Sequence, residues 1–286
     1  MPPRRNPSLR QRRLGAELRK IREAAALRGP QLARILDIDV SQISQMESGR
    51  IGVSRQRLRA IGNACKCLND PLINALGDMT QDRTKGWWEE YRGLLPSAFL
   101  ESAEHEDFAA GVMKVWTSAF LPGLLQTNDY AKGIFSRKIP GLTTHEVDLH
   151  AAFRTQRRSM FLRRPQKRLV AYLHESCLYT RFGGTEVLRA QLDCLVDDSR
   201  RDKISIRVIP FNVHTYPGAI ENMIYSFGVV PELDTVEMDT SRGPIFFDAP
   251  SELGTYRAIF ERIEKVALTD EESRALIHAV SRKLKD

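Results

Sequence analysis

The chain has 286 residues, of which 42% are hydrophobic and 28% charged, the balance of an ordinary globular protein. This composition excludes fibrous and largely disordered classes, and the length predicts about two domains. The longest uncharged stretch, residues 115–128, contains proline, glutamine and asparagine and is too short for a membrane helix. Residues 1–13 carry five arginines and no apolar run, so we expect no secretory signal.

The four cysteines are few for this length and predict a reduced, cytoplasmic protein. They fit neither a paired disulfide framework nor the spacing of zinc knuckles. The six histidines also lack metal-ligand spacing, because His145 and His150 are five residues apart and diverge on a helix. We therefore expect no metal and no cofactor.

Positive charge is concentrated in the first third of the chain. Residues 1–84 hold 16 Lys and Arg against 8 Asp and Glu, a net charge of +8, whereas the remaining residues hold 27 against 28. Such asymmetry predicts a polyanionic partner. The alternative is a solvated basic arm, since five of these arginines lie in residues 1–13.

Five short helices are predicted between residues 14 and 78 from apolar residues spaced three and four apart. Pro30 suits the first turn of the second helix, because its missing N–H costs nothing there. Asp39 is expected to cap the third helix with its carboxylate, and Gly49 to end it at positive φ. The residues predicted to face inward are Leu14, Leu18, Ile21, Ala25, Leu32, Ala33, Leu36, Ile43, Met46, Leu58, Ile61, Cys65, Leu72 and Leu76.

A turn of about three residues joins the second and third helices, which is the signature of a helix-turn-helix. The third helix presents Ser41, Gln42, Ser44 and Gln45 outward, with no acid before Glu47. Glutamine pairs with adenine, and serine reaches either bases or phosphates, so this face suits the major groove of DNA. The alternative, a helical bundle that binds another protein, fits the charge of +8 less well.

The run Ile-Ser-Gln-Met-Glu-Ser-Gly-Arg at residues 43–50 resembles the XRE (phage-repressor, Cro-like) helix-turn-helix family. The resemblance covers residues 14–78 and implies an all-α, five-helix, lambda-repressor-like domain whose third helix reads base edges. Val40 departs from the family's usual polar residue and suits contact with a thymine methyl instead. The DNA-binding residues that the resemblance implies are Arg28, Gln31, Val40, Ser41, Gln42, Ser44, Gln45 and Arg50.

The rest of the chain is predicted to be a second domain of the α+β class. Residues 79–85 are polar and lack apolar periodicity, which predicts a linker before a domain over residues 86–286. Thr269 and Glu272 have the spacing of a capping box at the start of the last helix. Strands are expected at residues 113–116, 168–173, 204–208, 223–230 and 234–238, and helices at 124–135, 146–162, 186–196 and 256–267.

Residues 86–286 offer little catalytic chemistry. Nucleotide-binding, P-loop, zinc-protease and nucleophile-elbow motifs are missing from the sequence. His174 and Cys177 form a nucleophilic pair only if they touch, and a packed cysteine beside a solvent-side histidine is the simpler interpretation. We expect no catalytic residue. The aromatic residues are expected in the core, the alternative being a ligand pocket; they are Trp87, Trp88, Tyr91, Trp116, Phe120 and Tyr130.

The string Leu-Pro-Gly-Leu-Leu-Gln-Thr at residues 121–127 resembles a C-terminal domain of actinobacterial XRE regulators. This resemblance covers about residues 85–285 and implies an antitoxin-like regulatory or partner-binding domain rather than an enzyme, for which a small acidic protein is a possible partner. For Pro122-Gly123, a turn that begins a helix is the alternative to a functional role. Further matches are at residues 154–157, 174–175, 191–192 and 206–211.

These observations together predict a sequence-specific transcriptional regulator, cytoplasmic and associated with the nucleoid. We expect a homodimer on a palindromic site in double-stranded DNA, whose C-terminal domain binds a small-molecule effector or a protein partner, with no membrane association. One alternative is an antitoxin-like protein that acts mainly through a small acidic partner. The other is an enzyme that carries a DNA-binding module.

Overall fold

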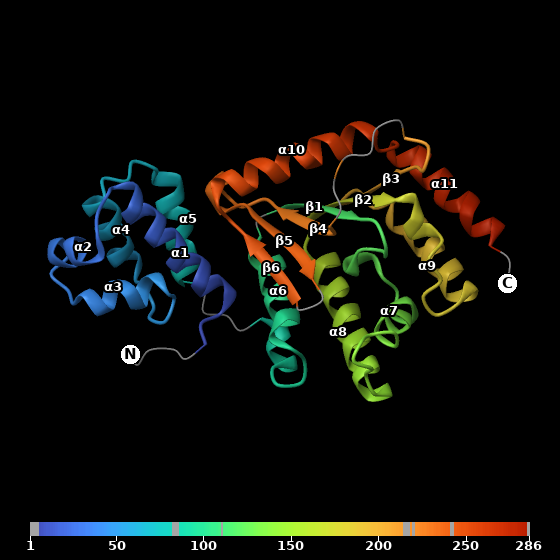
Figure 1. Ribbon diagram of the computed structural model, residues 1–286, viewed down its shortest axis with the longest axis horizontal. Helices are drawn as coiled ribbons and strands as arrows, with labels where there is room; N and C mark the ends of the chain where they lie inside the picture. Colours follow the sequence, from blue (N-terminus) through green and yellow to red (C-terminus); the bar gives the residue numbers. More distant parts are fainter. Residues whose placement is uncertain are drawn as a thin grey trace. The chain divides into compact units, whose positions relative to one another are not determined.

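The computed structural model describes residues 6–81, 86–109, 111–213, 218, 221–240 and 243–284. The chain forms two compact units, Met1–Arg92 with Pro96–Phe108 and Gly93–Leu95 with Ala109–Asp286. The first is helical throughout its described elements and the second combines a six-stranded sheet with helices (Figure 1). The predicted fold class, an N-terminal helix-turn-helix unit followed by an α+β domain, is confirmed.

The first unit begins with the five predicted helices. The apolar stripes that predicted them form its core, in which Leu18, Leu32, Leu58 and Leu76 have almost no exposed surface. Ala25 and Leu36, also expected inside, are half-buried. The elements are α1 (Leu9–Ala24), α2 (Gly29–Ile35), α3 (Val40–Glu47), α4 (Arg55–Ala64), α5 (Asp70–Gln81), the 3-10 turn η1 (Trp87–Tyr91) and α6 (Ser97–Phe108).

Helix α1 begins within the segment predicted as a basic arm. Ser8 Oγ accepts a hydrogen bond from the backbone N–H of Gln11, and Gln11 Oε1 accepts one from the N–H of Ser8 at 3.0 Å. This capping box satisfies two of the N–H groups that a helix start leaves unpaired. Glu104 of α6 accepts a third, from the N–H of Leu9 at 2.9 Å. Residues 9–13 are therefore helical, and residues 1–5 lie outside the described part of the chain.

Helix α3 begins and ends where predicted, but the predicted hydrogen bond from its first turn to the Asp39 carboxylate is wrong. Asp39 is the N-cap residue with extended backbone angles, but its carboxylate accepts no hydrogen bond from the first turn. Its backbone carbonyl instead accepts the N–H of Gln42 at 3.0 Å. Gly49 has φ of +73°, as predicted for the residue that ends this helix.

Residues 96–108 pack with the first unit, although the sequence places them in the second domain. Glu104 bonds the start of α1, and Glu101 forms an ion pair with Arg12 at 3.0 Å. These are long-range contacts between α6 and α1, which periodicity does not reveal. The linker at residues 79–85 stays a prediction, since α5 extends to Gln81 and residues 82–85 lie outside the described chain.

The second unit is built on a mixed sheet with strand order β3-β2-β1-β4-β5-β6. Strands β1, β2 and β3 are parallel and are joined by crossovers through α7–α8 and α9, whereas β4, β5 and β6 are antiparallel. Its elements are β1 (Val112–Thr117), α7 (Asn128–Phe135), α8 (Thr144–Leu162), β2 (Arg168–His174), α9 (Thr185–Asp198), β3 (Ile204–Ile209), β4 (Met223–Ser226), β5 (Thr235–Thr240), β6 (Gly243–Phe247), α10 (Pro250–Val266) and α11 (Asp270–Lys283), with 3-10 turns at Gly123–Leu125, Glu175–Leu178 and Pro231–Leu233.

The sheet carries a separate core on each face. Helix α10 covers one face, and α7, α8, α9 and α11 lie on the side of the other (Figure 1). Trp116, Tyr172 and Tyr225 pack toward Leu253, Phe260 and Ile263 of α10 on the first face. The opposite core contains Met113, Val115, Leu169, Leu173, Ile206, Leu188, Leu192, Leu195, Ile277 and Val280. Two-sided burial explains why β2 appears in the sequence as a nearly continuous apolar run.

Several boundaries in this unit differ from their predictions. The helix expected at residues 124–135 begins at Asn128, because Pro122 and Gly123 open a 3-10 turn and Thr127 caps the helix. The strand expected at 223–230 ends at Ser226. Strand β6 and helix α6 were not predicted. The capping box at Thr269 is confirmed, since its Oγ accepts from the N–H of Glu272 at 3.2 Å.

A Gly15→Ala substitution is expected to destabilise the first unit by about 1–3 kcal/mol, the usual cost of overpacking. A Cβ atom on Gly15 would lie 2.7 Å from the carbonyl oxygen of Met46 and closer still to that of Glu47, both in the backbone of α3. Urea denaturation of the two proteins measures the difference. The control is Gly254→Ala on α10, where a Cβ meets nothing within 4 Å; an equal loss there would contradict the close-packing argument.

Candidate DNA-binding interface

Helix α3 has one buried and one exposed face. Ile43 and Met46 are buried in the core of the first unit, as predicted. Ser41, Gln42 and Ser44 are exposed, and Gln45 is half-buried. The side chains of these four polar residues make no hydrogen bond to another residue in the described part of the chain. The outer face of α3 is therefore a surface of uncharged donors and acceptors open to an external partner.

An ion pair attaches the end of α3 to α1. The guanidinium of Arg22 donates from Nε to Glu47 Oε1 at 2.5 Å and from Nη2 to Glu47 Oε2 at 2.9 Å. Its third nitrogen donates to the carbonyl of Leu27 at 2.8 Å. The hydrogen bond to Glu47 raises the pKa of Arg22 above its ordinary value. The only acidic side chain of α3 is thus neutralised on the inner side of the helix.

Two glycines let the backbones of α1 and α3 approach closely. Gly15 of α1 faces the last turn of α3, as described above. Gly49 combines positive φ with close approach, since a Cβ there would lie 2.6 Å from the carbonyl oxygen of Gln11. A helix held by backbone contact and by a bidentate ion pair keeps a fixed orientation. Such rigidity is what a reader of base edges needs.

The remaining predicted residues lie at the first position of α3, directly after it, and at the start of α2. Arg50 follows it directly and is exposed, as is Arg28 at the start of α2. Gln31 Oε1 accepts the backbone N–H of Arg28 at 2.7 Å, which gives this side chain a capping role in α2. Val40 is 49% exposed at the first position of α3 and presents an apolar surface beside the serines and glutamines.

Sequence reasoning missed the residues that hold this surface in place. Each of these residues contacts a part of the chain at least 25 positions away. Arg22 bonds the side chain of Glu47, whereas Gly15 and Gly49 pack against backbone atoms. Gly49 was recognised as a helix end, but its contact with α1 was not. The available signal was Glu47, an acid at the end of a helix otherwise suited to a polyanion, which implies a cationic partner elsewhere.

In the second unit, the segment 121–127 forms a hydrogen-bonded turn. Gln126 Nε2 donates to the carbonyl of Leu121 at 2.6 Å, and Arg154 donates to Gln126 Oε1 at 3.0 Å. Gln191 of α9 accepts the N–H of Thr127 at 2.6 Å and donates to the carbonyl of Leu125 at 2.8 Å. Two of the motif's partners in the sequence, at residues 154–157 and 191–192, thus support the backbone of this turn.

The histidine and cysteine at the end of β2 do not form a nucleophilic pair. His174 Nδ1 lies 2.7 Å from Ser176 Oγ, and Ser176 Oγ donates to the carbonyl of Ser118 at 2.5 Å. Cys177 is fully buried, with Sγ directed at the carbonyls of Thr117 and Phe120. Burial raises the pKa of Cys177 to about 12, so that its thiol is a poor nucleophile.

Other site chemistries receive no support from the described residues. No group of three or more His, Cys, Asp or Glu side chains among them is arranged to hold a metal ion. No helix in the described part of the chain has the length and hydrophobicity needed to cross a membrane. The four thiols, at Cys65, Cys67, Cys177 and Cys194, are free.

The arrangement of α1 to α5 defines a helix-turn-helix unit, and comparison with known families agrees. The family described as "Helix-turn-helix domain" matches residues 13–76. The family described as "Domain of unknown function (DUF5753)" matches residues 100–279, more than half of the chain, and the protein therefore belongs to the DUF5753 family. Neither the curated proteins nor the solved structures contain a match. The helix-turn-helix match indicates a DNA-binding regulator.

Proposed function

We propose that this protein is a sequence-specific transcriptional regulator that binds double-stranded DNA through α3. The observation that carries the proposal is the outer face of α3, where uncharged hydrogen-bonding side chains point to solvent from a helix fixed on its inner side. In the major groove, glutamine commonly forms two hydrogen bonds with adenine, and serine commonly bonds to bases or phosphates. Arg50 and Arg28 would then lie near phosphates, while Gln31 keeps its capping bond.

Selection of DNA from a random duplex library tests this proposal. We expect the wild-type protein to enrich a palindrome, because a dimer would place two copies of α3 in major grooves about 34 Å apart. A Gln42→Ala/Gln45→Ala variant should enrich a broader motif or none. Asn74→Ala, an exposed amide on α5, is the matched control and should select the wild-type motif. No enriched motif from folded wild-type protein would reject sequence reading.

Single substitutions should separate base contacts from phosphate contacts. Gln42→Ala or Gln45→Ala is expected to cost about 1–3 kcal/mol on the selected site and much less on unrelated DNA. Arg50→Ala should weaken binding to all sequences alike and make the salt dependence shallower by about one unit of slope. Fluorescence anisotropy titrations on both duplexes measure these effects. Equal losses on both duplexes for the glutamine and the arginine variants would contradict α3 as the reader.

The second unit is proposed to regulate DNA binding by accepting a small-molecule effector or a protein. In open α/β sheets, ligands bind beyond the carboxyl ends of the parallel strands. At that edge the rings of Tyr179 and Phe211 are stacked at 6.1 Å and exposed, and Glu175 accepts bonds from the Tyr179 hydroxyl and the Phe211 N–H. An effector there would act by favouring one dimer geometry, with reciprocal coupling to DNA.

The antitoxin-like alternative makes a different prediction. A protein that acts mainly through a small acidic partner should co-purify with it, and its affinity for DNA alone should be weak. Tight and selective DNA binding by the isolated protein would contradict this alternative. An enzymatic role would need convergent titratable groups in one cavity, and the Cys177–His174 geometry offers none.

A further inference from the structure

A second basic surface lies on the α+β unit, at the edge where its parallel strands begin. Residues 163–168 lead into β2, which begins at Arg168, and residues 200–203 precede β3; together they hold seven Lys and Arg and a single acid, Asp202. These two segments are neighbours because β2 and β3 pair in parallel, with Leu169 opposite Ile204 and the N–H of Leu169 bonded to the carbonyl of Lys203 at 2.8 Å.

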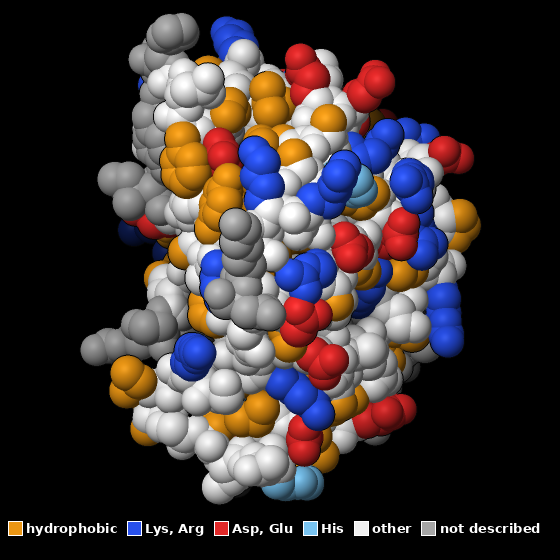
Figure 2. All heavy atoms as spheres, turned by 90° about the vertical axis from the view of Figure 1, so that its right-hand side faces the viewer, with side chains coloured by type: hydrophobic (Ala, Val, Ile, Leu, Met, Phe, Trp, Pro, Cys, Tyr) orange, Lys and Arg blue, Asp and Glu red, His pale blue; other side chains and the backbone are white. Residues whose placement is uncertain are grey.

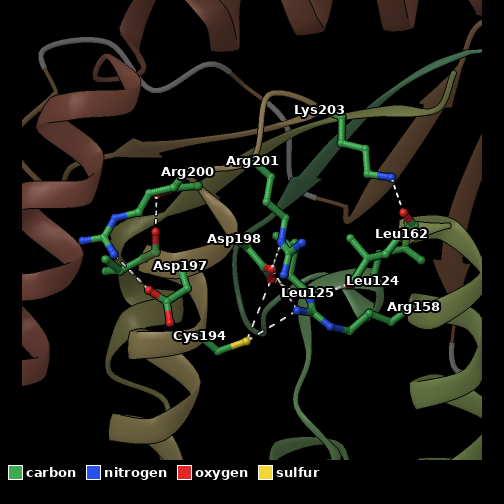
Figure 3. A network of polar contacts seen from close by, with 12 residues as sticks. Leu124, Leu125, Arg158, Leu162, Cys194, Asp197, Asp198, Arg200, Arg201 and Lys203 are labelled. Atoms are coloured by element: carbon green, nitrogen blue, oxygen red, sulfur yellow. Dashed lines mark hydrogen bonds and ion pairs between the residues drawn. The ribbon is translucent and has the colours of Figure 1, made fainter. Parts of the chain in front are cut away.

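Two of the seven cations serve the fold rather than the surface. Lys203 Nζ points inward and donates to the carbonyl of Leu162 at 2.5 Å (Figure 3). It also donates to the carbonyl of Arg164 at 3.2 Å, which ties the two segments together. Lys167 is buried and donates to the carbonyl of Ala109. The other five, which we name the amino-edge arginines, are Arg163, Arg164, Arg168, Arg200 and Arg201.

The acids near this surface neutralise only part of its charge. Asp198 is buried and already shared by two guanidiniums, those of Arg158 and Arg201 (Figure 3). Asp197 pairs with Arg200 at 3.1 Å, but both side chains are more than 60% exposed. Exposed pairs of this kind are worth less than about 1 kcal/mol and exchange readily for another anion.

The composition of the surface identifies the kind of partner. Every large hydrophobic side chain in residues 154–168 and 197–207 is shielded from solvent to some degree, and none is among the exposed ones. Protein–protein interfaces depend on buried apolar anchors, whereas protein–DNA interfaces are polar and strongly positive. All five surface cations are arginines, whose planar guanidinium matches a phosphate through two parallel hydrogen bonds.

We propose that the amino-edge arginines bind phosphates of duplex DNA, as a contact independent of sequence and separate from α3. The α+β unit would then add affinity without adding specificity, because phosphate contacts carry no sequence information. Figure 2 shows one side of the molecule, on which Lys and Arg side chains are mixed with Asp and Glu. Residues 154–168 hold seven Lys and Arg and no acid.

The test compares two variants of the full-length protein that lose the same charge. Arg163→Gln/Arg168→Gln/Arg200→Gln removes three exposed amino-edge arginines and leaves both partners of Asp198 in place. The control, Arg262→Gln/Lys265→Gln/Lys283→Gln, removes three exposed cations from α10 and α11. Melting curves followed by circular dichroism establish that both variants are folded. Affinity for a scrambled duplex about four helical turns long is then measured by anisotropy at several salt concentrations.

We expect the logarithmic salt dependence of the amino-edge variant to be shallower than wild type by about 2 to 3, since each phosphate contact contributes about 0.9. The control variant should keep the wild-type slope. Equal slopes for the two variants would overturn the proposal. So would loss of polyglutamate binding with an unchanged DNA slope, a result that would assign the surface to an acidic polypeptide.

This result is independent of sequence reading by α3. The Gln42→Ala/Gln45→Ala variant should keep the wild-type salt slope on the scrambled duplex while losing selectivity for the enriched site. If the wild-type protein selects no motif, the proposed function fails, and the comparison of slopes still decides whether the amino-edge arginines contact DNA.

Discussion

Substitution of Asp198 by alanine is expected to destabilise the α+β unit by about 3–5 kcal/mol, the usual cost of removing one partner from a buried ion pair. Asp198 is 1% exposed and accepts two bonds from Arg158, at 2.6 and 2.9 Å, and one from Arg201 at 3.1 Å. Arg158 also donates to the carbonyl of Leu124, so this pair joins α8, α9 and the turn before α7. Without the carboxylate, a half-buried guanidinium remains without its counter-charge (Figure 3).

Hydrogen exchange followed by mass spectrometry measures the loss of stability in the α+β unit separately. A separate measurement is needed because a chain of two units need not unfold in a single step. Peptides from α9 and β3 should exchange roughly 100-fold faster or more, since 1.4 kcal/mol corresponds to a factor of ten. Asp197→Ala is the matched control, because Asp197 is the neighbouring residue with a 72% exposed side chain. Equal acceleration in both variants would contradict a structural role for the buried pair.

Substitution of Glu47 by alanine is expected to have an effect of similar size on the helix-turn-helix unit, about 3 kcal/mol. Arg22 is 11% exposed and would lose both of its bonds to α3. Because this pair fixes the orientation of α3, we also expect weaker binding to the selected DNA site. Urea denaturation measures the first effect, and anisotropy titration measures the second.

Glu23→Ala provides the control for Glu47→Ala. Glu23 pairs with Arg19 across one turn of α1, with 51% and 64% of the two side chains exposed, and it also lies 3.5 Å from Arg22 Nη2. Exposed pairs of this spacing contribute about 0.3–0.5 kcal/mol, so little change is expected in either stability or DNA binding. A Glu47→Ala protein as stable as Glu23→Ala would show that the backbone contacts at Gly15 and Gly49 suffice to hold α3.

The sequence predicted most reliably what depends on neighbouring residues. The five N-terminal helices, the positive φ of Gly49, the capping box at Thr269 and most strands of the sheet follow from periodicity and local capping chemistry. The outward face of α3 follows from the same periodicity, because Ile43 and Met46 fix which side is buried. The four polar residues of that face therefore follow from the local pattern of the chain, whereas the other proposed DNA contacts follow from the family resemblance.

The sequence by itself thus determined the helical nature of the first unit, the α+β class of the second and the polar face of α3. Tertiary structure alone decided how α3 is held, where α6 packs and how residues 163–168 and 200–203 come together. The physical reason is the same in each case. Each of these features depends on contacts between residues that are distant in the chain, and such contacts leave no periodic pattern in the sequence. They are the pairing of Arg22 with Glu47, of Glu104 with the start of α1, and of β2 with β3.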